Sequence, residues 1–291
     1  MPASRQVDLF LDSLVNAPLK DDRALMEFPF FGLSKNPRHE PIEYDDGRVK
    51  IRVTSGEKGI ATIWDKDVLI YVASLINERI ERGAPVERTV RFPAYDLLRL
   101  TGRGTSATVY EQLKDALFRL RSTTITTSIA SAGDQEDRGF GWIDSFRIVK
   151  KDAPGDRRVM AAVEVTLTDW MYRALVKERR VLTINPAYFQ LTKGIERRLY
   201  ELARKHLGRQ VDWTIGLPRL AEKVGSVRDL RKFKAELSAI IRANTLPDYG
   251  LTLLDPPPEV PVRRRNEETK VTFWHREGAV DILPPLSGSV D

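Results

Sequence analysis

The stretch that decides the fold is residues 88–120, RTVRFPAYDLLRLTGRGTSATVYEQLKDALFRL. Its first five residues alternate as in a short strand, Pro93 opens a short helix that ends at Gly102, and a polar turn follows. A longer helix with one apolar face is predicted next, because apolar residues recur at helical spacing: Leu113, Leu117 and Leu120. A strand, a short helix, a turn and a longer helix are the parts of a helix-turn-helix unit.

The same order recurs in residues 212–241, DWTIGLPRLAEKVGSVRDLRKFKAELSAII. A short helix again ends at a glycine, Gly225, and Ser226 is expected to cap the long helix after it. The apolar face of that helix matches the first copy at a constant offset of 120 residues: Phe233, Leu237 and Ile240. A duplicated unit is the simplest account of this match.

Each copy is flanked by the further elements of a winged helix. A helix precedes each, from Asp65 to about Gly83 and from Ile195 to about Leu207. The segments 123–129 and 140–149 are expected to form the first wing. In the second copy, strands at 251–254 and 270–274 flank a Pro- and Arg-rich loop, 256–266. Ahead of the first copy, 49–53 and 60–64 are predicted strands.

The chain is therefore predicted to be an α+β protein of two tandem winged helix-turn-helix domains with β-hairpin wings. We expect a flexible N-terminal arm at 1–40, a first domain at 41–178, a second domain at 179–276 and a flexible tail at 277–291. The length of 291 residues is ample for two domains of this size.

Composition excludes several kinds of site. The chain has no cysteine and only three histidines, at His39, His206 and His275. Disulfides, thiolate metal sites and a cysteine nucleophile are excluded, and the His spacing fits no zinc site, so we expect neither metal nor cofactor. No apolar run is long enough for a membrane span and no signal peptide pattern is present, which predicts a cytoplasmic protein without a membrane partner.

Positive charge is concentrated in one part of the chain. Between Arg173 and Arg242 there are 17 Lys and Arg against 7 Asp and Glu, whereas the rest of the chain carries a net charge of −4. Such asymmetry is typical of a phosphate-binding surface, but a solvated helical face laced with ion pairs explains the charge equally well.

The outward face of each long helix supplies the candidate DNA contacts. A recognition helix keeps one face on the core and presents the other to the major groove, where Arg binds guanine and Lys contacts phosphates. In the second copy the candidates are Arg228, Arg231, Lys232 and Lys234, with Arg263, Arg264 and Arg265 in the wing. In the first copy they are milder and would serve either DNA reading or dimerisation: Arg103, Thr105, Ser106, Thr108, Gln112 and Lys114.

Two fragments resemble parts of catalytic sites, but neither is sufficient to predict one. His206 and Arg209 form an H-x-x-R pattern of the kind that tyrosine recombinases place beside their nucleophile, with Tyr249 as the candidate; the surrounding basic helix explains the same residues. The GRGTS sequence from Gly102 lacks the lysine of a phosphate-binding loop. We therefore expect no enzymatic activity.

The N-terminus contains QVDLF, residues 6–10, which resembles the short motif by which bacterial proteins dock on the DNA polymerase sliding clamp. In that reading Leu9 and Phe10 fill an apolar pocket while Gln6 orients the chain. The alternative is the first turn of an amphipathic helix with Leu9 and Phe10 facing the core.

Four segments together resemble the plasmid replication initiator protein A (RepA) family: KDD at 20–22, MEFPFFGLSK at 26–35, ATIWDKD at 61–67 and GIERRLYELARK at 194–205. The resemblance covers about Leu9 to Arg276. It implies two winged-helix domains that bind directly repeated sites (iterons) at a plasmid origin, opening of an adjacent A·T-rich stretch, and recruitment of the host initiator, helicase and sliding clamp. Relatives in the wider group bind DNA as monomers to start replication and as homodimers to repress their own gene.

The expected function is therefore a plasmid- or nucleoid-associated replication initiator. The alternative is a tandem winged-helix transcriptional repressor without origin-opening activity, which would have no use for a clamp motif.

Overall fold

Two halves of the chain share one order of elements in the computed structural model, which describes residues 20–22, 25–47, 49–131, 134–153, 157–179 and 181–276. The first repeat comprises α1 (Lys66–Glu81), β4 (Thr89–Pro93), α2 (Ala94–Leu100), α3 (Ala107–Ser122), β7 (Ile143–Ala153) and β8 (Arg157–Leu167). The second comprises α5 (Gly194–Leu207), β10 (Asp212–Gly216), α6 (Leu217–Val224), α7 (Leu230–Ala243), β11 (Tyr249–Leu254) and β12 (Lys270–His275). Both three-stranded sheets are antiparallel, and in each the last strand lies between the other two, in the orders β4-β8-β7 and β10-β12-β11.

The helices form where the apolar spacing predicts them. The matched faces of α3 and α7 are buried to within 1% of full burial, at Leu113, Leu117, Leu120, Phe233, Leu237 and Ile240. Each preceding short helix is followed by a glycine with positive φ, +67° at Gly102 and +79° at Gly225, a conformation that favours glycine. The cap of α7 is Asp229 rather than the expected Ser226, because the Asp229 carboxylate accepts a hydrogen bond from the Lys232 N–H at 2.9 Å.

The expected first wing, 123–129 with 140–149, is wrong, because 124–131 pairs with 134–140 and 143–149 lies in another sheet. Strands β5 (Thr124–Ser131) and β6 (Asp134–Phe140) join β2 (Ile42–Asp45) and β3 (Val49–Thr54) in a separate sheet of order β2-β3-β5-β6. Ile125 lies opposite Val53 there, and both are buried. The hairpin that extends the sheet of the first repeat is β7–β8.

Two smaller expectations also differ. Residues 60–64 form no strand and make only a bridge between Gly32 and Thr62, because the Asp65 carboxylate accepts the Thr62 N–H at 2.7 Å and closes a turn. The predicted loop 256–266 contains the start of a short helix, α8 (Val262–Glu268), between β11 and β12. The remaining elements are α4 (Asp169–Val176), β9 (Val181–Thr183) and the 3-10 helix η1 (Pro186–Gln190).

The expected flexible arm is wrong from Lys20 onward. Strand β1 (Lys20–Asp22) pairs with β9, and the segment 25–33, here called the junction segment, enters both hydrophobic cores. Leu25, Phe30 and Phe31 lie in the core of the first repeat, whereas Met26 lies in the core of the second. Residues 1–19, with the clamp-like motif at Gln6, Leu9 and Phe10, and residues 277–291 lie outside the described residues.

Glycines allow the junction segment to approach the second repeat closely. A Cβ on Gly194 would lie 2.2 Å from the Leu33 carbonyl oxygen, and one on Gly225 would lie 2.7 Å from the Pro29 Cβ. The two repeats are therefore joined by packing as well as by the chain that connects them.

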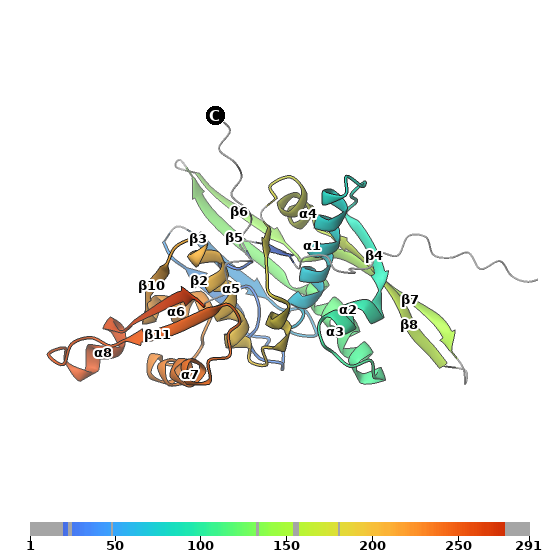
Figure 1. Cartoon of the computed structure of the whole chain (residues 1–291). Helices are drawn as coiled ribbons and strands as arrows, with labels where there is room; N and C mark the ends of the chain where they lie inside the picture. Colours follow the sequence, from blue (N-terminus) through green and yellow to red (C-terminus); the bar gives the residue numbers. More distant parts are fainter. Residues whose placement is uncertain are drawn as a thin grey trace, which may run out of the picture.

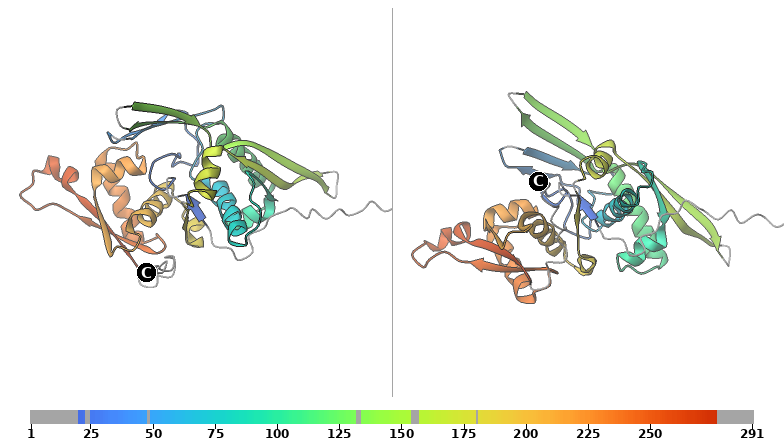
Figure 2. Two further views of the ribbon diagram at one scale, coloured as in Figure 1. Left: turned by 90° about the horizontal axis from the view of Figure 1, so that it is seen from above. Right: turned by 45° about the horizontal axis from the view of Figure 1, so that its top comes forward.

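The two long helices lie on one side of the molecule. Figure 1 and the right view of Figure 2 show α3 and α7 at the lower edge, one in each repeat. The β7–β8 hairpin extends outward at one end and the β11–α8–β12 hairpin at the other, while β5–β6 points away from the two helices. Among the helices of the described residues, none is long and apolar enough to cross a membrane.

Candidate nucleic-acid interface

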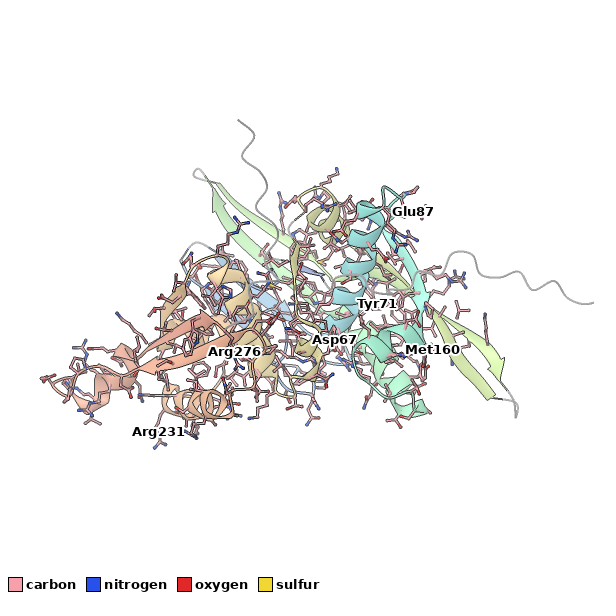
Figure 3. The ribbon with its side chains drawn as sticks, viewed as in Figure 1. Asp67, Tyr71, Glu87, Met160, Arg231 and Arg276 are labelled. Carbon is pink, nitrogen blue, oxygen red and sulfur yellow. The ribbon has the colours of Figure 1, made fainter. Side chains whose placement is uncertain are left out.

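The surface of α7 combines basic and small side chains. Arg231 and Lys232 near its N-terminus are exposed, as is Ala235 one turn later, and Figure 3 shows Arg231 projecting from the lower edge. Arg228 lies in the turn before the helix, with 57% of its side chain exposed and one ion pair to Glu236 at 3.3 Å. The predicted set thus comes together at the start of α7, where a recognition helix presents residues to base edges.

Lys234 differs from the rest of that set. Its Nζ lies 2.6 Å from an Asp255 carboxylate oxygen and donates to Thr269 Oγ1 at 3.1 Å, and only 22% of the side chain is exposed. Lys234 therefore fixes the β11–β12 hairpin against α7 instead of presenting a free cation. The Lys234 ammonium also lowers the pKa of the Asp255 carboxyl.

The three wing arginines lie on α8 and differ in their contacts. Arg263 is exposed and has no ion pair within the part of the chain that the structure describes. Arg264 pairs with Glu268 at 3.1 Å, and Arg265 donates to the Val260 and Pro258 carbonyls. Arg263 is available at the end of the hairpin, Arg264 is 58% exposed but paired, and Arg265 holds the 258–265 turn together.

The corresponding surface of α3 is less basic. Thr105, Ser106, Thr108 and Gln112 are exposed, but Lys114 pairs with Glu111 at 3.2 Å and Asp115 pairs with Lys58. Phe118 is 41% exposed and packs edge-on against Phe146 of β7, which fixes the hairpin on this side of the helix. This face suits a secondary or shape-dependent DNA contact better than base readout by arginine.

Arg103 is not part of that outward face. It donates to the Trp64 carbonyl oxygen and to the Asp67 carboxylate, both at 2.6 Å. Asp67 is 1% exposed and also accepts from Arg197 of α5 at 2.6 Å. Through Asp67, which is labelled near the centre of the molecule in Figure 3, Arg103 connects the turn of the first helix-turn-helix to the second repeat.

Further buried ion pairs join the same elements. Lys66 is fully buried, with Asp21 at 2.6 Å and Glu201 at 2.8 Å, and Arg198 also binds Glu201. Burial opposes the charge on Lys66, but the two carboxylates raise the pKa of its ammonium above the usual value. Burial likewise opposes charge on Glu201, yet Lys66 and Arg198 lower the pKa of its carboxyl. These groups are charged and compensated, so they hold the repeats in one arrangement.

Basic residues on β7–β8 were missed by the sequence reasoning. Lys150 and Lys151 lie on β7, and Arg157 and Arg158 lie on β8, opposite Ala153 and Asp152 in the antiparallel register. Two basic pairs on either side of the DAPGD sequence at 152–156 were a usable signal, since such a turn predicts a hairpin tip. The expected wing, 123–129 with 140–149, stops short of this turn.

The recombinase-like pair does not form a site. Tyr249 is 2% exposed and packs among the rings of Tyr200 and His275. His206 stacks on Trp213 and binds Glu27 at 3.1 Å. A tyrosine buried in this way cannot reach a DNA phosphate.

Comparison with known proteins gives four matches. The family model of replication initiator protein A matches residues 20–251. A putative replication protein of Wigglesworthia glossinidia brevipalpis is 35% identical over 242 residues, which cover 82% of this chain and 86% of that protein. A crystal structure of domains 2 and 3 of RctB superimposes with a TM-score of 0.63 at 13% identity, covering 87% of this chain and 98% of that one, and so shares the fold. The Pi initiator protein in complex with iteron DNA is more distant, with a TM-score of 0.49, 19% identity and coverage of 73% and 90%.

Proposed function

The chain belongs to the replication initiator protein A family, and on this premise we propose that it is a plasmid replication initiator that binds directly repeated origin sites through two winged helix-turn-helix units. A replication initiator role follows from the family itself. Binding of direct repeats, opening of the origin and recruitment of host replication proteins are the further parts of the proposal.

The observation that carries the DNA-binding mode is the placement of α3 and α7 on one side of the molecule, each with a hairpin on its outer flank (Figure 1). Two reading helices on one face reach successive major grooves when their sites are about 34 Å apart, one turn of B-DNA. The hairpins then lie over the flanking phosphates.

The two helices have unequal roles in this proposal. Arg228 and Arg231 stand at the start of α7, where bidentate contacts to guanine are made. Asp229, whose carboxylate caps the helix, also pairs with Lys232 at 3.2 Å. The α3 surface includes Glu111 and Asp115. We therefore assign base readout mainly to α7 and register or dimer contacts to α3.

Footprinting on duplex DNA from both sides of the gene tests the function. Protection of several direct repeats, each spanning two adjacent major grooves on one helix face, is the expected result. Protection of a single promoter palindrome would instead support the alternative, a transcriptional repressor.

Recruitment is tested separately, with the full chain and purified host proteins. The proposal has the chain working in the cytoplasm on plasmid DNA, with the clamp contacted through Gln6, Leu9 and Phe10, and with the host initiator and helicase as further partners. If DNA opening at the repeats is lost without these partners while binding to the repeats is unchanged, recruitment is separate from site recognition.

A further inference from the structure

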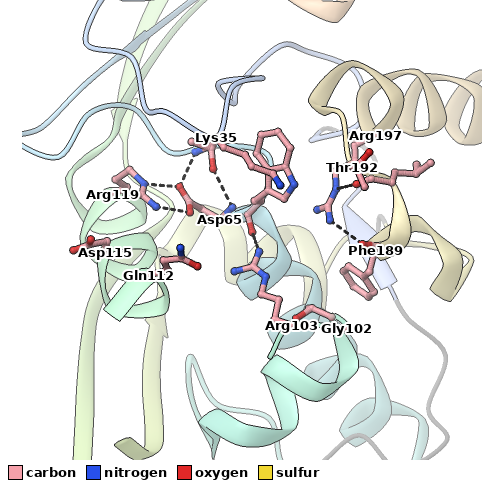
Figure 4. A pocket seen from close by; sticks show the side chains of 14 residues that line it. Lys35, Asp65, Gly102, Arg103, Gln112, Asp115, Arg119, Phe189, Thr192 and Arg197 are labelled. Carbon is pink, nitrogen blue, oxygen red and sulfur yellow. Dashed lines mark hydrogen bonds and ion pairs between the residues drawn. The ribbon is translucent and has the colours of Figure 1, made fainter. Parts of the chain in front are cut away.

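A groove runs between the two reading helices. Two adjoining hollows of about 400 and 600 Å³ share Trp64 as a common wall. The first is lined by Gln112, Asp115 and Arg119 of α3, and the second by Arg228, in the turn before α7, and by Glu236 in the middle of α7. Figure 4 shows the α3 side chains of the first hollow on one side and Phe189, Thr192 and Arg197 on the other.

Residues on different sides of α7 and α3 show where this groove lies relative to the two hairpins. On α7, Lys234 binds the β11–β12 hairpin while Glu236 faces the groove. On α3, Phe118 packs on the β7–β8 hairpin while Arg119 faces the groove. The order across the surface is hairpin, α7, groove, α3, hairpin. DNA that places α7 and α3 in successive major grooves therefore carries its intervening backbone over the groove.

The charge of the lining favours an anion. The two hollows together are lined by seven Lys and Arg side chains and four carboxylates. Each of those carboxylates has a cation partner: Asp65 with Arg119, Asp115 with Lys58, Glu236 with Arg228, and Glu40 with Arg38. Arg103 and Arg197 share the single carboxylate of Asp67. The groove thus retains uncompensated positive charge.

Two exposed lysines line the groove, one in each hollow. Lys35 is exposed, and within the described part of the chain its ammonium has no carboxylate partner; it lies 5.6 Å from the centroid of the Trp64 ring. Lys193 lines the second hollow, with 52% of its side chain exposed and its Nζ 4.0 Å from a Glu196 carboxylate oxygen. A lysine ammonium held in this way is a point contact for a phosphate oxygen.

We propose that this groove binds the sugar–phosphate backbone of duplex DNA between the two major-groove contacts, with Lys35 and Lys193 as the phosphate-binding residues. The inference rests on the proposed function and adds to it a contact that none of the sequence-predicted residues provides. Since backbone contacts carry no base information, the groove fixes the spacing of the two helices on DNA rather than the sequence they read.

The test uses the full chain and a 40-base-pair duplex that the wild-type chain has selected from a random-sequence pool. Lys35→Ala and Lys193→Ala are each expected to lower the slope of log affinity against log salt by about 0.9, which corresponds to about 8-fold weaker binding at 0.1 M salt relative to 1 M. Base preference should stay unchanged. Ethylation of phosphates midway between the two protected grooves should block the wild-type chain and have no effect on the double variant.

Lys177→Ala is the matched control, because Lys177 is an exposed lysine without a carboxylate partner in the described structure and caps α4 at the top of Figure 1. Slopes of the groove variants equal to that of Lys177→Ala would overturn the proposal. So would weaker binding of a thymidine 30-mer with duplex binding intact, since the groove would then hold a single strand. Interference only at phosphates beneath α3 and α7 overturns the groove and leaves the proposed function standing, whereas selection of no duplex at all by the wild-type chain counts against the proposed function itself.

Discussion

Replacing Asp67 by alanine is expected to destabilise the whole protein, because this carboxylate joins the two repeats from a buried position. Its two oxygens each accept a hydrogen bond of 2.6 Å, one from Arg197 and one from Arg103. The Arg197 side chain is 3% exposed, so it cannot regain water when its partner is lost. Removing one member of a buried ion pair costs about 3–5 kcal/mol.

The lower end of that range applies here. Arg197 keeps its hydrogen bonds to the Leu191 and Phe189 carbonyls, and Arg103, at 22% exposure, can hydrate in part. A loss of about 3 kcal/mol is a large share of a total stability of about 5–15 kcal/mol. With a urea slope of about 3 kcal/mol per molar, the unfolding midpoint falls by about 1 M.

Urea unfolding followed by circular dichroism measures the effect, and Asp115→Ala is the matched control. Asp115 pairs with Lys58 at the surface, with 39% and 42% of the side chains exposed, so its loss should cost less than about 1 kcal/mol. The double variant Asp67→Leu with Arg197→Met should recover most of the stability, because the two nearly fully buried charges are removed together and only the partly exposed Arg103 loses its partner. Equal midpoints for Asp67→Ala and Asp115→Ala would refute the reasoning.

Three other predictions concern separate parts of the chain. Arg231→Ala should weaken binding to the selected duplex by about 1–3 kcal/mol and to random DNA far less; equal losses in a binding titration would reduce Arg231 to a backbone contact. Burial opposes charge on Glu27, but hydrogen bonds from His206, Lys205 and Lys223 hold the pKa of its carboxyl far below the usual 4.5. A lowered folded-state pKa contributes stability that is present above pH 4.5 and is lost as the pH falls below it. The free energy of unfolding should therefore decline more steeply below pH 4.5 in the wild type than in Glu27→Gln. Parallel pH profiles of the two proteins would contradict this. Leu9→Ala with Phe10→Ala should abolish clamp pull-down and leave melting temperature and repeat binding unchanged; a lowered melting temperature would identify both residues as core.

Local patterns in the sequence were sufficient for the helices of both repeats. A helix can be predicted from the spacing of apolar residues within a short window. The apolar faces that contain Leu113 and Phe233 are buried, as that spacing predicts. The pairing of strands is not local. The segment at 124–131 alternates equally well for either sheet, and its partner β3 lies about 70 residues earlier in the chain. Periodicity alone could not choose between a wing and this second sheet.

The buried charges were equally invisible in the sequence. Lys66 and Asp67 look like ordinary residues in the first turn of a helix, and their partners Glu201 and Arg197 come about 130 residues later. The aromatic run in the junction segment shows no period, so its place in two cores had no local signal. In the candidate site, the sequence pattern identified the residues at the start of α7. It did not show that Lys234 and Arg103 form ion pairs within the protein, because their partners Asp255 and Asp67 are distant in the sequence.

The junction segment packs into both hydrophobic cores, and this determines the order in which the nascent chain can complete its structure. Met26 receives its partner Arg198 from a position 172 residues downstream. At ribosomal rates of about 5–20 residues per second, Met26 is made roughly 9–34 s before that partner. The core of the first repeat contains only residues made before the second repeat, whereas Met26 stays uncovered until the second repeat is largely synthesised. A break in the chain between the repeats would accordingly leave the second repeat without Met26 in its core.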